Sequence, residues 1–287
     1  MLWISVAVFA VVIALLGVAV ARARRRSVQP DHDARWGEPF VIIGGVIGPM
    51  IILAIVFVIA LRDMAALSGP PGEIRTTVDV IGHDWWWEAD YGETGAVTAN
   101  EIHIPVGEPV RIRLTTADVI HSFWVPQLQA KSDMIPGSVN EMWLQADRPG
   151  RYRGQCAEFC GLQHAQMIFY VVAESPDEFR RWADEVAEPA AEPATASARR
   201  GREVFLTSTC VGCHAIRGTE ADATLGPDLT HLAERETIAA GVLANTRANL
   251  SLFVTDPQDV KPGTTMPPTD LTQEELAALL DYLEQLQ

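Results

Sequence analysis

The residues of this chain best suited to chemistry are its four cysteines, which fall into two short clusters. The first cluster is CAEFCGLQHAQM, residues 156–167, and it combines two cysteines with a glutamate, a histidine and a methionine. The second is CVGCH, residues 210–214. No thiol remains for an unrelated disulfide, so each cluster is a candidate site for a metal or a cofactor.

The residue types of the first cluster favour copper. Cys156, Cys160 and His164 would also suit a tetrahedral zinc site if a second histidine joined them, but zinc has no need of Met167. Thiolate, imidazole and thioether groups are the soft ligands of copper electron-transfer centres. Because a single blue-copper ion uses only one cysteine, two cysteines indicate two copper ions bridged by two sulfurs.

A second histidine is required, and the candidate is His121 in VIHSFWVP. It comes just after a strand pattern, at a loop where a rigid sheet could present its side chain. His103 competes for this role, but it stands between Ile102 and Ile104. Side chains alternate along a strand, so His103 is expected on the outer face.

The second cluster is the attachment signature of c-type haem. In C-x-x-C-H both cysteines form thioethers with the haem and the histidine is the proximal ligand, which assigns Cys210, Cys213 and His214. Met266 in TTMPP lies at a suitable distance along the chain to be the sixth ligand. Methionine opposite histidine raises the haem potential.

Two long apolar runs precede these clusters. Residues 2–20 contain no charge and could span the roughly 30 Å hydrocarbon core of a bilayer, and residues 40–61 form the second run. The segment between them carries Arg22, Arg24, Arg25, Arg26 and Arg35. By the positive-inside rule this segment is cytoplasmic and both ends of the chain face outward. A cleaved secretory signal is the alternative for the first run, but its positive residues would come before the apolar stretch.

The sequence after the SGPPG turn at residues 68–72 is typical of short strands. VRIRL, residues 110–114, alternates apolar and basic residues, and MWLQA and MIFYVV are further short runs bounded by turn residues. The pattern predicts an antiparallel sandwich or barrel. On a strand, the consecutive Trp85, Trp86 and Trp87 would alternate, with the middle ring on the face opposite the other two.

A helical unit follows a stretch rich in Ala, Pro and Glu, whose composition predicts a tether. The last helix has a capping-box pattern at Thr272 and Glu275 and one leucine face. That face comprises Leu276, Leu279, Leu280 and Leu283. The predicted organisation is a transmembrane hairpin at 1–67, a β-domain at 68–185, a linker at 186–198 and a helical haem domain at 199–287.

Taken in order, the hairpin and the motifs HSFWVP, KSDMIPG and RPGRYRGQCAEFCGLQHAQM resemble subunit II of the haem–copper cytochrome c oxidases. The tail from Arg199 resembles a small class I cytochrome c, as in caa-type enzymes. The resemblance implies a cupredoxin-like β-barrel with a dinuclear copper A centre. Its ligands would be His121, Cys156, the Glu158 backbone carbonyl, Cys160, His164 and Met167.

The resemblance also implies roles for single residues. Trp85 matches the position where electrons enter from cytochrome c, whereas Trp86 and Trp87 are equally explained as an aromatic core. The Glu158 carboxylate would reach a magnesium ion at the interface with the catalytic subunit. Glu38 lies where the family often has a glutamate near a proton pathway, although a helix dipole also favours an acidic residue at a helix start.

The expected function is that of the electron-input subunit of a terminal oxidase in a bacterial cytoplasmic membrane, with the soluble domains on the outer side. Electrons would pass from cytochrome c or another donor to haem c, to copper A and to the haem of subunit I, where oxygen is reduced. Subunit III and the lipid bilayer are further expected partners, and nucleic acid is not. The net charge of −15 would steer a basic donor.

Three alternative functions share part of this pattern. A nitric oxide reductase with a copper A subunit would reuse the same domain, and only the catalytic partner distinguishes it. A quinol oxidase subunit of this fold lacks the copper ligands, whereas all six positions are filled here. A copper carrier or assembly factor would have little use for covalent haem.

Overall fold

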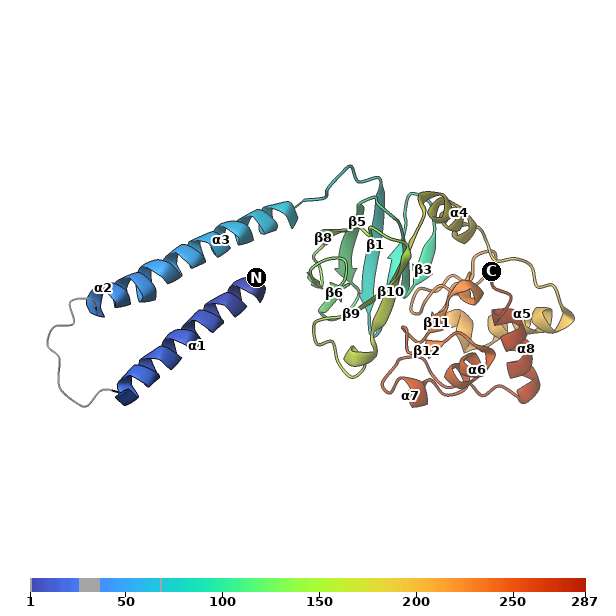
Figure 1. Ribbon diagram of the computed structural model, residues 1–287. Coiled ribbons are helices and arrows are strands. Elements are labelled where there is room, and N and C mark those ends of the chain that lie inside the picture. Colours follow the sequence, from blue (N-terminus) through green and yellow to red (C-terminus); the bar gives the residue numbers. More distant parts are fainter. Residues whose placement is uncertain (1, 26–36, 68) are drawn as a thin grey trace. The chain divides into compact units, whose positions relative to one another are not determined.

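The computed structural model describes residues 2–25, 37–67 and 69–287 of the chain. These residues form two compact units, Met1–Ser68 and Gly69–Gln287. The first unit is helical, and the second combines strands with short helices (Figure 1).

The first unit contains the two predicted apolar helices. Helix α1 is Leu2–Arg25; the second stretch consists of α2 (Gly37–Ile42), a π-helical turn η1 (Ile43–Ile47) and α3 (Gly48–Leu67). Leu2–Arg25 and Gly37–Ala65 are each long and apolar enough to cross a membrane. Three of the five arginines behind the predicted cytoplasmic loop end α1, whereas Arg26 and Arg35 lie outside the described residues.

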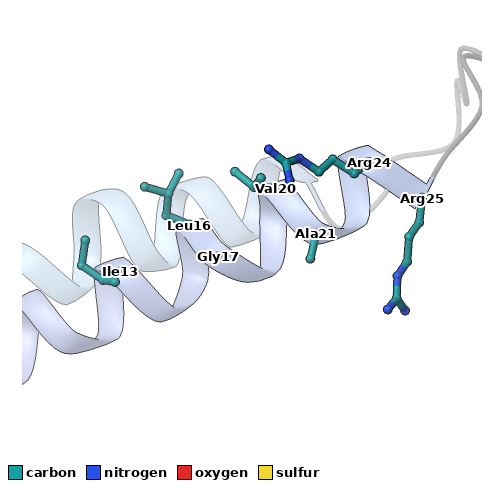
Figure 2. Close-up of a pocket in the computed structure, with 7 residues that line it drawn as sticks. All are labelled: Ile13, Leu16, Gly17, Val20, Ala21, Arg24 and Arg25. Atoms are coloured by element: carbon teal, nitrogen blue, oxygen red, sulfur yellow. The ribbon is translucent and has the colours of Figure 1, made fainter.

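A hollow of about 610 Å³ runs along α1 (Figure 2). The side chains that line it are aliphatic from Ile13 to Ala21, and Arg24 and Arg25 close one end. It contains no thiol, imidazole or carboxylate, so it is not the site of the predicted metal chemistry. An aliphatic helix face that ends in arginines suits lipid chains and their anionic headgroups.

The β-domain of the second unit consists of two five-stranded sheets (Figure 1). In spatial order, the first contains β3 (Val97–Ala99), β2 (Trp86–Asp90), β1 (Thr76–His83), β5 (Val110–Thr116) and β8 (Asn140–Leu144). The second contains β4 (Glu101–Pro105), β10 (Ile168–Glu174), β9 (Gly150–Cys156), β6 (His121–Trp124) and β7 (Ser132–Met134). Trp87, Phe123 and Phe169 are fully buried in the core of this domain.

The predicted cupredoxin-like β-domain is confirmed, but its sheets are not wholly antiparallel. Strand β1 pairs in parallel with β5, and β4 pairs in parallel with β10. Parallel neighbours need a long connection, because a tight turn can join only antiparallel strands. The chain from β2 to β4 supplies that connection between β1 and β5.

The tryptophan run does not alternate along one strand, so that prediction was wrong. Strand β1 ends at His83, a turn holds Asp84 and Trp85, and β2 begins at Trp86. Trp86 and Trp87 are both buried, whereas Trp85 is half-buried. The turn interrupts the strand periodicity, which frees Trp85 to take a position of its own.

The haem-domain sequence folds into short helices joined by irregular segments. Its elements are α5 (Ala196–Thr207), η3 (Thr209–Gly212), η4 (Leu232–Glu234), the short strands β11 (Thr237–Ile238) and β12 (Leu243–Ala244), α6 (Arg247–Thr255), α7 (Pro257–Val260) and α8 (Gln273–Leu283). The predicted capping box at Thr272 is confirmed. Of the four leucines on the predicted face, three are buried and Leu276 is half-buried.

The stretch predicted as a tether, residues 186–198, contains the end of α4 (Pro176–Ala187) and the start of α5. The extended part between these helices is hydrogen-bonded rather than free. Its Ala190 amide donates to the Arg217 carbonyl at 3.0 Å, and its Ala194 amide donates to Gln285 Oε1 at 3.0 Å. Backbone amides can dock a segment that has few apolar side chains, and composition does not reveal this.

Candidate copper and haem sites

The first cysteine cluster connects two paired strands. Strand β9 ends at Cys156 and β10 begins at Ile168, and the two strands run antiparallel. On its other side β9 pairs with β6, which begins at His121 and places Phe123 opposite Cys156. The sheet therefore brings His121 to a loop that is 35 residues away in the sequence.

Donor atoms converge on the sulfur of Cys156. Its Sγ lies 3.7 Å from Cys160 Sγ, 3.8 Å from His121 Nδ1 and 3.2 Å from the Glu158 carbonyl oxygen. Cys156 is 4% exposed and His121 is fully buried. A metal ion bound here would be shielded from water on this side.

The sulfur of Cys160 has its own set of neighbours. Its Sγ lies 3.6 Å from His164 Nδ1 and 3.8 Å from Met167 Sδ. Together with the neighbours of Cys156, these atoms complete the six predicted ligands. The structure thus brings all six side chains or carbonyls to one place, while their binding of copper stays a prediction.

The two thiols influence each other's protonation. The hydrogen bond from Cys160 lowers the pKa of the Cys156 thiol, and the same hydrogen bond raises the pKa of Cys160. Two sulfurs so close cannot both carry negative charge unless a cation compensates. A bound metal provides that cation, because the thiolate is the ligand.

His121 is held in one orientation by a residue that the sequence did not single out. Its Nε2 lies 2.8 Å from Asp118 Oδ1, so Nδ1 faces the sulfur of Cys156. Burial lowers the pKa of His121, but the hydrogen bonds to Cys156 and Asp118 outweigh it and raise the pKa overall. A carboxylate that accepts the second N–H of a metal-bound imidazole is a common supporting contact.

Gly82 of β1 provides the room for the His121 ring. A Cβ atom at this position would lie 2.8 Å from His121 Cδ2. No periodicity in the sequence marks Gly82, because its role depends on which strand faces His121. Asp118 carried a weak signal, since it stands three residues before a candidate ligand.

Trp85 lies against the copper-binding loop. Its indole Nε1 donates to the Cys160 carbonyl at 2.7 Å. Gly161 has φ +112°, and a Cβ there would lie 2.9 Å from Trp85 Cζ2, so only glycine allows the ring to approach so closely. The rejected candidate His103 instead stacks on Trp182, with ring centroids 3.9 Å apart, and pairs with Glu174.

The carboxylate of Glu158 points away from the sulfurs toward a different partner. It lies 3.7 Å from Lys131 Nζ, and both side chains are about half exposed. The backbone carbonyl of Glu158 therefore lies beside Cys156, whereas its carboxylate lies beside Lys131. An exposed pair of this kind contributes little to stability. The binding of magnesium by this carboxylate stays a prediction.

The haem-attachment motif follows α5 directly. Cys210 lies on η3, and the motif continues through Cys213 to His214, whose Nδ1 donates to the Pro227 carbonyl at 2.8 Å. This bond leaves Nε2 available for iron. Burial lowers the pKa of His214, which favours the neutral imidazole that binds metals. A Cβ at Gly226 would lie 2.7 Å from His214 Cε1, so a glycine is needed beside the ring.

Two further predicted residues lie outside the two cysteine clusters. Met266 is half-buried in the irregular segment after α7, and its carbonyl accepts a 3.4 Å hydrogen bond from Gln258. Its role as the sixth haem ligand stays a prediction. Glu38 lies in the first turn of α2, and its link to a proton pathway also stays a prediction.

The donor sets fit the two expected cofactors. Two thiols, two imidazoles, a thioether and a carbonyl form a soft set that suits copper rather than magnesium or calcium. Cys210, Cys213 and His214 would provide the two thioether positions and the iron ligand of a c-type haem. Both fits rest on the kinds of donor atom and on their convergence.

Comparisons with known proteins agree with these fits. The family model "Cytochrome C oxidase subunit II, periplasmic domain" matches residues 96–175, and the family model "Cytochrome c" matches residues 198–287. Fold, donor sets and apolar helices define a membrane-anchored electron-transfer protein that carries copper and haem domains.

Relatives give the particular family. The "Cytochrome c oxidase subunit 2" of Alkalihalophilus pseudofirmus is 38% identical over 283 residues, which cover 96% of this chain and 82% of the relative. The same protein of Bacillus sp. (strain PS3) is 32% identical over 252 residues, covering 83% and 70%. The crystal structure of the periplasmic domain of subunit II of Bradyrhizobium japonicum cytochrome oxidase is 31% identical, covers 40% of this chain and 95% of its own, and has a TM-score of 0.39. The chain belongs to the cytochrome c oxidase subunit 2 family.

Family membership establishes the coarse function. The chain is a subunit of a haem–copper oxidase, acts in electron input and works with the catalytic subunit of that enzyme. Its domains are those of copper A and of haem c.

Proposed function

We propose that this chain passes electrons from a cytochrome c donor, through covalent haem c and dinuclear copper A, to the haem of the catalytic subunit, where oxygen is reduced to water. The observation that carries the proposal is the convergence of six donor groups on two sulfurs 3.7 Å apart. The haem-attachment motif on the same chain supplies the preceding carrier.

The geometry supports two copper ions rather than one. Each sulfur has an imidazole nitrogen within 3.8 Å and one further donor, which is the Glu158 carbonyl for Cys156 and Met167 for Cys160. When bound, copper A supplies a carrier whose transferred electron is shared by two ions. The protein's part is to keep the ligands still, which β6, β9 and β10 do by fixing the ends of the loop.

Trp85 is the proposed position at which electrons enter the copper-binding loop. Its indole N–H donates to the carbonyl of Cys160, a ligand, so the ring lies directly beside the site. The ring is only half-buried by the protein, in contrast to the buried Trp86 and Trp87. Trp87 belongs to the core of the β-domain, and Trp86 packs with Ala99 and with Ala240 of the haem domain.

The proposed location is a bacterial cytoplasmic membrane, with the copper and haem domains on its outer side. Two apolar helical stretches provide the anchor, and arginines end α1 on the proposed cytoplasmic side. Expected further partners are subunit III and an external donor. Magnesium bound by the Glu158 carboxylate at the interface with the catalytic subunit belongs to this proposal too.

Copper content provides the test. The full chain, reconstituted with copper, is expected to hold two copper ions and one haem and to show the near-infrared absorption and paramagnetic signal of a mixed-valence pair. Cys156→Ser or Cys160→Ser should abolish those signals and leave the haem attached. The double variant Cys210→Ser/Cys213→Ser should lose covalent haem and keep the copper signals.

Two outcomes would contradict the proposal. One is zinc, or a single copper ion per chain, in the reconstituted protein. The other is a chain that holds both cofactors but transfers no electron from reduced haem to copper. The alternative of a nitric oxide reductase subunit has no observation in its favour, since the relatives compared are oxidase subunits.

A further inference from the structure

A buried lysine of the haem domain reaches the copper-binding domain at Trp85. Lys261 follows α7 and is only 3% exposed. Its Nζ donates to the Trp85 carbonyl at 2.7 Å and to the Gln166 carbonyl at 3.5 Å. The contact joins residues 176 positions apart in the sequence.

Burial of this ammonium group is unusual. Lysine is almost never fully buried unless it is paired, because removing its charge from water is costly. Among the described residues, no carboxylate lies within ion-pair distance of Nζ, and its hydrogen bonds go to the two backbone carbonyl oxygens. Burial lowers the pKa of Lys261 to about 8. Burying this charge costs free energy, so the contacts that hold Lys261 in place must offset that cost.

The two residues after Lys261 meet the same surface. The Pro262 carbonyl accepts a 2.7 Å hydrogen bond from Gln163, which stands next to the ligand His164. A Cβ at Gly263 would lie 2.8 Å from Leu162 Cδ1 and 3.7 Å from Trp85 Cη2. Residues 261–263 therefore lie on Trp85 and on the copper-binding loop, three residues before Met266.

Other contacts hold the haem domain without reaching Trp85. Arg151 of β9 pairs with Glu236 of the haem domain and with Glu101 at 2.9 Å. The Ile168 amide donates to the Ala240 carbonyl at 3.1 Å. These contacts hold the haem domain at a second place. The contacts of Lys261 therefore determine only the position of its own loop, residues 261–266.

We propose that Lys261 is a positioning residue that seats the methionine-bearing loop of the haem domain on Trp85 and so sets the rate of electron transfer from haem to copper within the chain. The inference rests on the proposed function. In the step concerned, ferrous haem iron becomes ferric, and the copper pair gains that one electron, with no proton transferred. Lys261 Nζ donates to the Trp85 carbonyl, and the Trp85 indole donates to the Cys160 carbonyl. Gly263 lies beside the same ring, since an added Cβ would be 3.7 Å from Trp85 Cη2.

The contact of residues 261–263 with Trp85 also bears on where an external donor delivers its electron, to the haem or directly to copper through Trp85. Residues 261–263 cover part of Trp85, so an external donor is expected to reduce the haem rather than to reach this tryptophan directly. Copper should therefore be reduced only after haem when an external cytochrome is added to the full chain.

The test uses the full chain and three variants. Lys261→Met removes the charge and the hydrogen bonds, Lys261→Arg keeps both, and Lys131→Met changes the only other lysine of the sequence. The rate of haem-to-copper transfer is measured after rapid photoreduction of the haem. Lys261→Met should slow it at least about tenfold, in keeping with the loss of hydrogen bonds from a charged group. Lys261→Arg should restore most of the rate, and Lys131→Met should not change it.

A second readout needs no copper. Hydrogen exchange of the backbone amides of residues 160–166 in the copper-free chain should speed up in Lys261→Met and stay unchanged in Lys131→Met. The haem potential should stay at the wild-type value in both Lys261 variants. The copper potential is compared in Lys261→Arg, which keeps the positive charge that interacts with Cys160, because Lys261→Met removes that charge. Gln163→Leu, which removes the bond to Pro262 from the other domain, should act in the same direction even if Lys261→Met fails to fold.

The outcomes separate the two proposals. If the wild-type chain transfers electrons and both Lys261→Met and Gln163→Leu do so equally fast, the role of Lys261 is wrong and the proposed function stands. If the wild-type chain shows no haem-to-copper transfer, the proposed function fails and this inference fails with it. Slower transfer with unchanged exchange at 160–166 would also overturn the positioning role.

Discussion

Asp118 contacts the predicted copper ligand His121 without being a predicted ligand itself. It accepts the imidazole N–H at 2.8 Å and also accepts the Asp84 amide at 2.6 Å. We expect Asp118→Asn to weaken copper binding about 10–100-fold, the range seen when such supporting contacts are lost. A competition titration of the full chain against a copper chelator measures this.

The control for this variant is Asp133→Asn. Asp133 is half exposed and faces Lys131 at 3.8 Å, so its substitution alters the local charge equally without touching His121. Equal copper affinity in Asp118→Asn and the wild-type chain would show that His121 needs no carboxylate to hold its orientation.

Sequence reasoning predicted the six donor groups but not the residues that support them, for a physical reason. Five of the six predicted donors fall within twelve residues, and their types alone indicate copper. Asp118 and Gly82 matter only because β1, β5 and β6 place them beside His121. A supporting residue has no characteristic spacing, so its role appears only when the strands are paired.

At the scale of the element, the packing of α5 on α8 depends on one glycine. A Cβ at Gly201 would lie 1.9 Å from the Ala278 carbonyl oxygen, and backbone cannot yield as a flexible side chain can. We expect Gly201→Ala to lower the free energy of unfolding of the haem domain by about 1–3 kcal/mol, as overpacked cores do. Denaturant unfolding of the full holo chain, followed by haem absorbance, measures it.

Arg200→Ala is the matched control on the same helix. Its side chain is exposed and forms only a surface pair with Glu203 at 3.0 Å, so its loss should change stability by less than about 0.5 kcal/mol. If Gly201→Ala were as stable as this control, α5 and α8 could move apart without loss of stability, and the prediction would be wrong.

The capping box of α8 predicts a pH dependence. Hydrogen bonds from the Thr272 backbone and hydroxyl lower the pKa of Glu275 below its unfolded value. A lowered folded pKa means that the cap stabilises the helix above the unfolded pKa, about 4.3, and that this contribution is lost as the pH falls through the folded pKa. We expect Glu275→Gln to reduce the acid-side loss of stability of the haem domain.

Unfolding midpoints between about pH 3 and pH 6 measure this effect. Glu274→Gln, one position earlier and outside the capping box, is the control and should follow the wild-type curve. Parallel curves for Glu275→Gln and the wild-type chain would contradict a role of the Glu275 carboxylate in the cap.

Helices and strands were predictable where a single local sequence pattern specifies them. The apolar runs, the alternating strand at 110–114 and the capped final helix all appear in the structure. The turn at Asp84 and Trp85 was missed, because three large aromatic residues fit strand periodicity without revealing a break. Parallel pairing of β1 with β5 was missed as well, since local patterns do not report which strands become neighbours.

At the scale of the whole molecule, the contact between the copper and haem domains was beyond sequence reasoning. Lys261 touches Trp85 across 176 residues, and Gln163 bonds to Pro262 across 99. Each pair is ordinary in its own segment, so composition gave no reason to connect them. The predicted tether gave no indication that the haem domain packs against the copper domain.

Net charge acts at this largest scale and gives the last prediction. The chain has 37 acidic and 22 basic residues, for a net charge of −15, so it attracts a basic cytochrome from solution. We expect the second-order rate of haem reduction by such a donor to fall at least about tenfold when ionic strength rises from about 10 mM to about 200 mM, because the screening length shrinks. Transfer from haem to copper within the chain should hardly change, since the two domains are already in contact and no charged partner has to diffuse to them. An uncharged small-molecule reductant is the control, and a flat response with the basic cytochrome would rule out electrostatic steering.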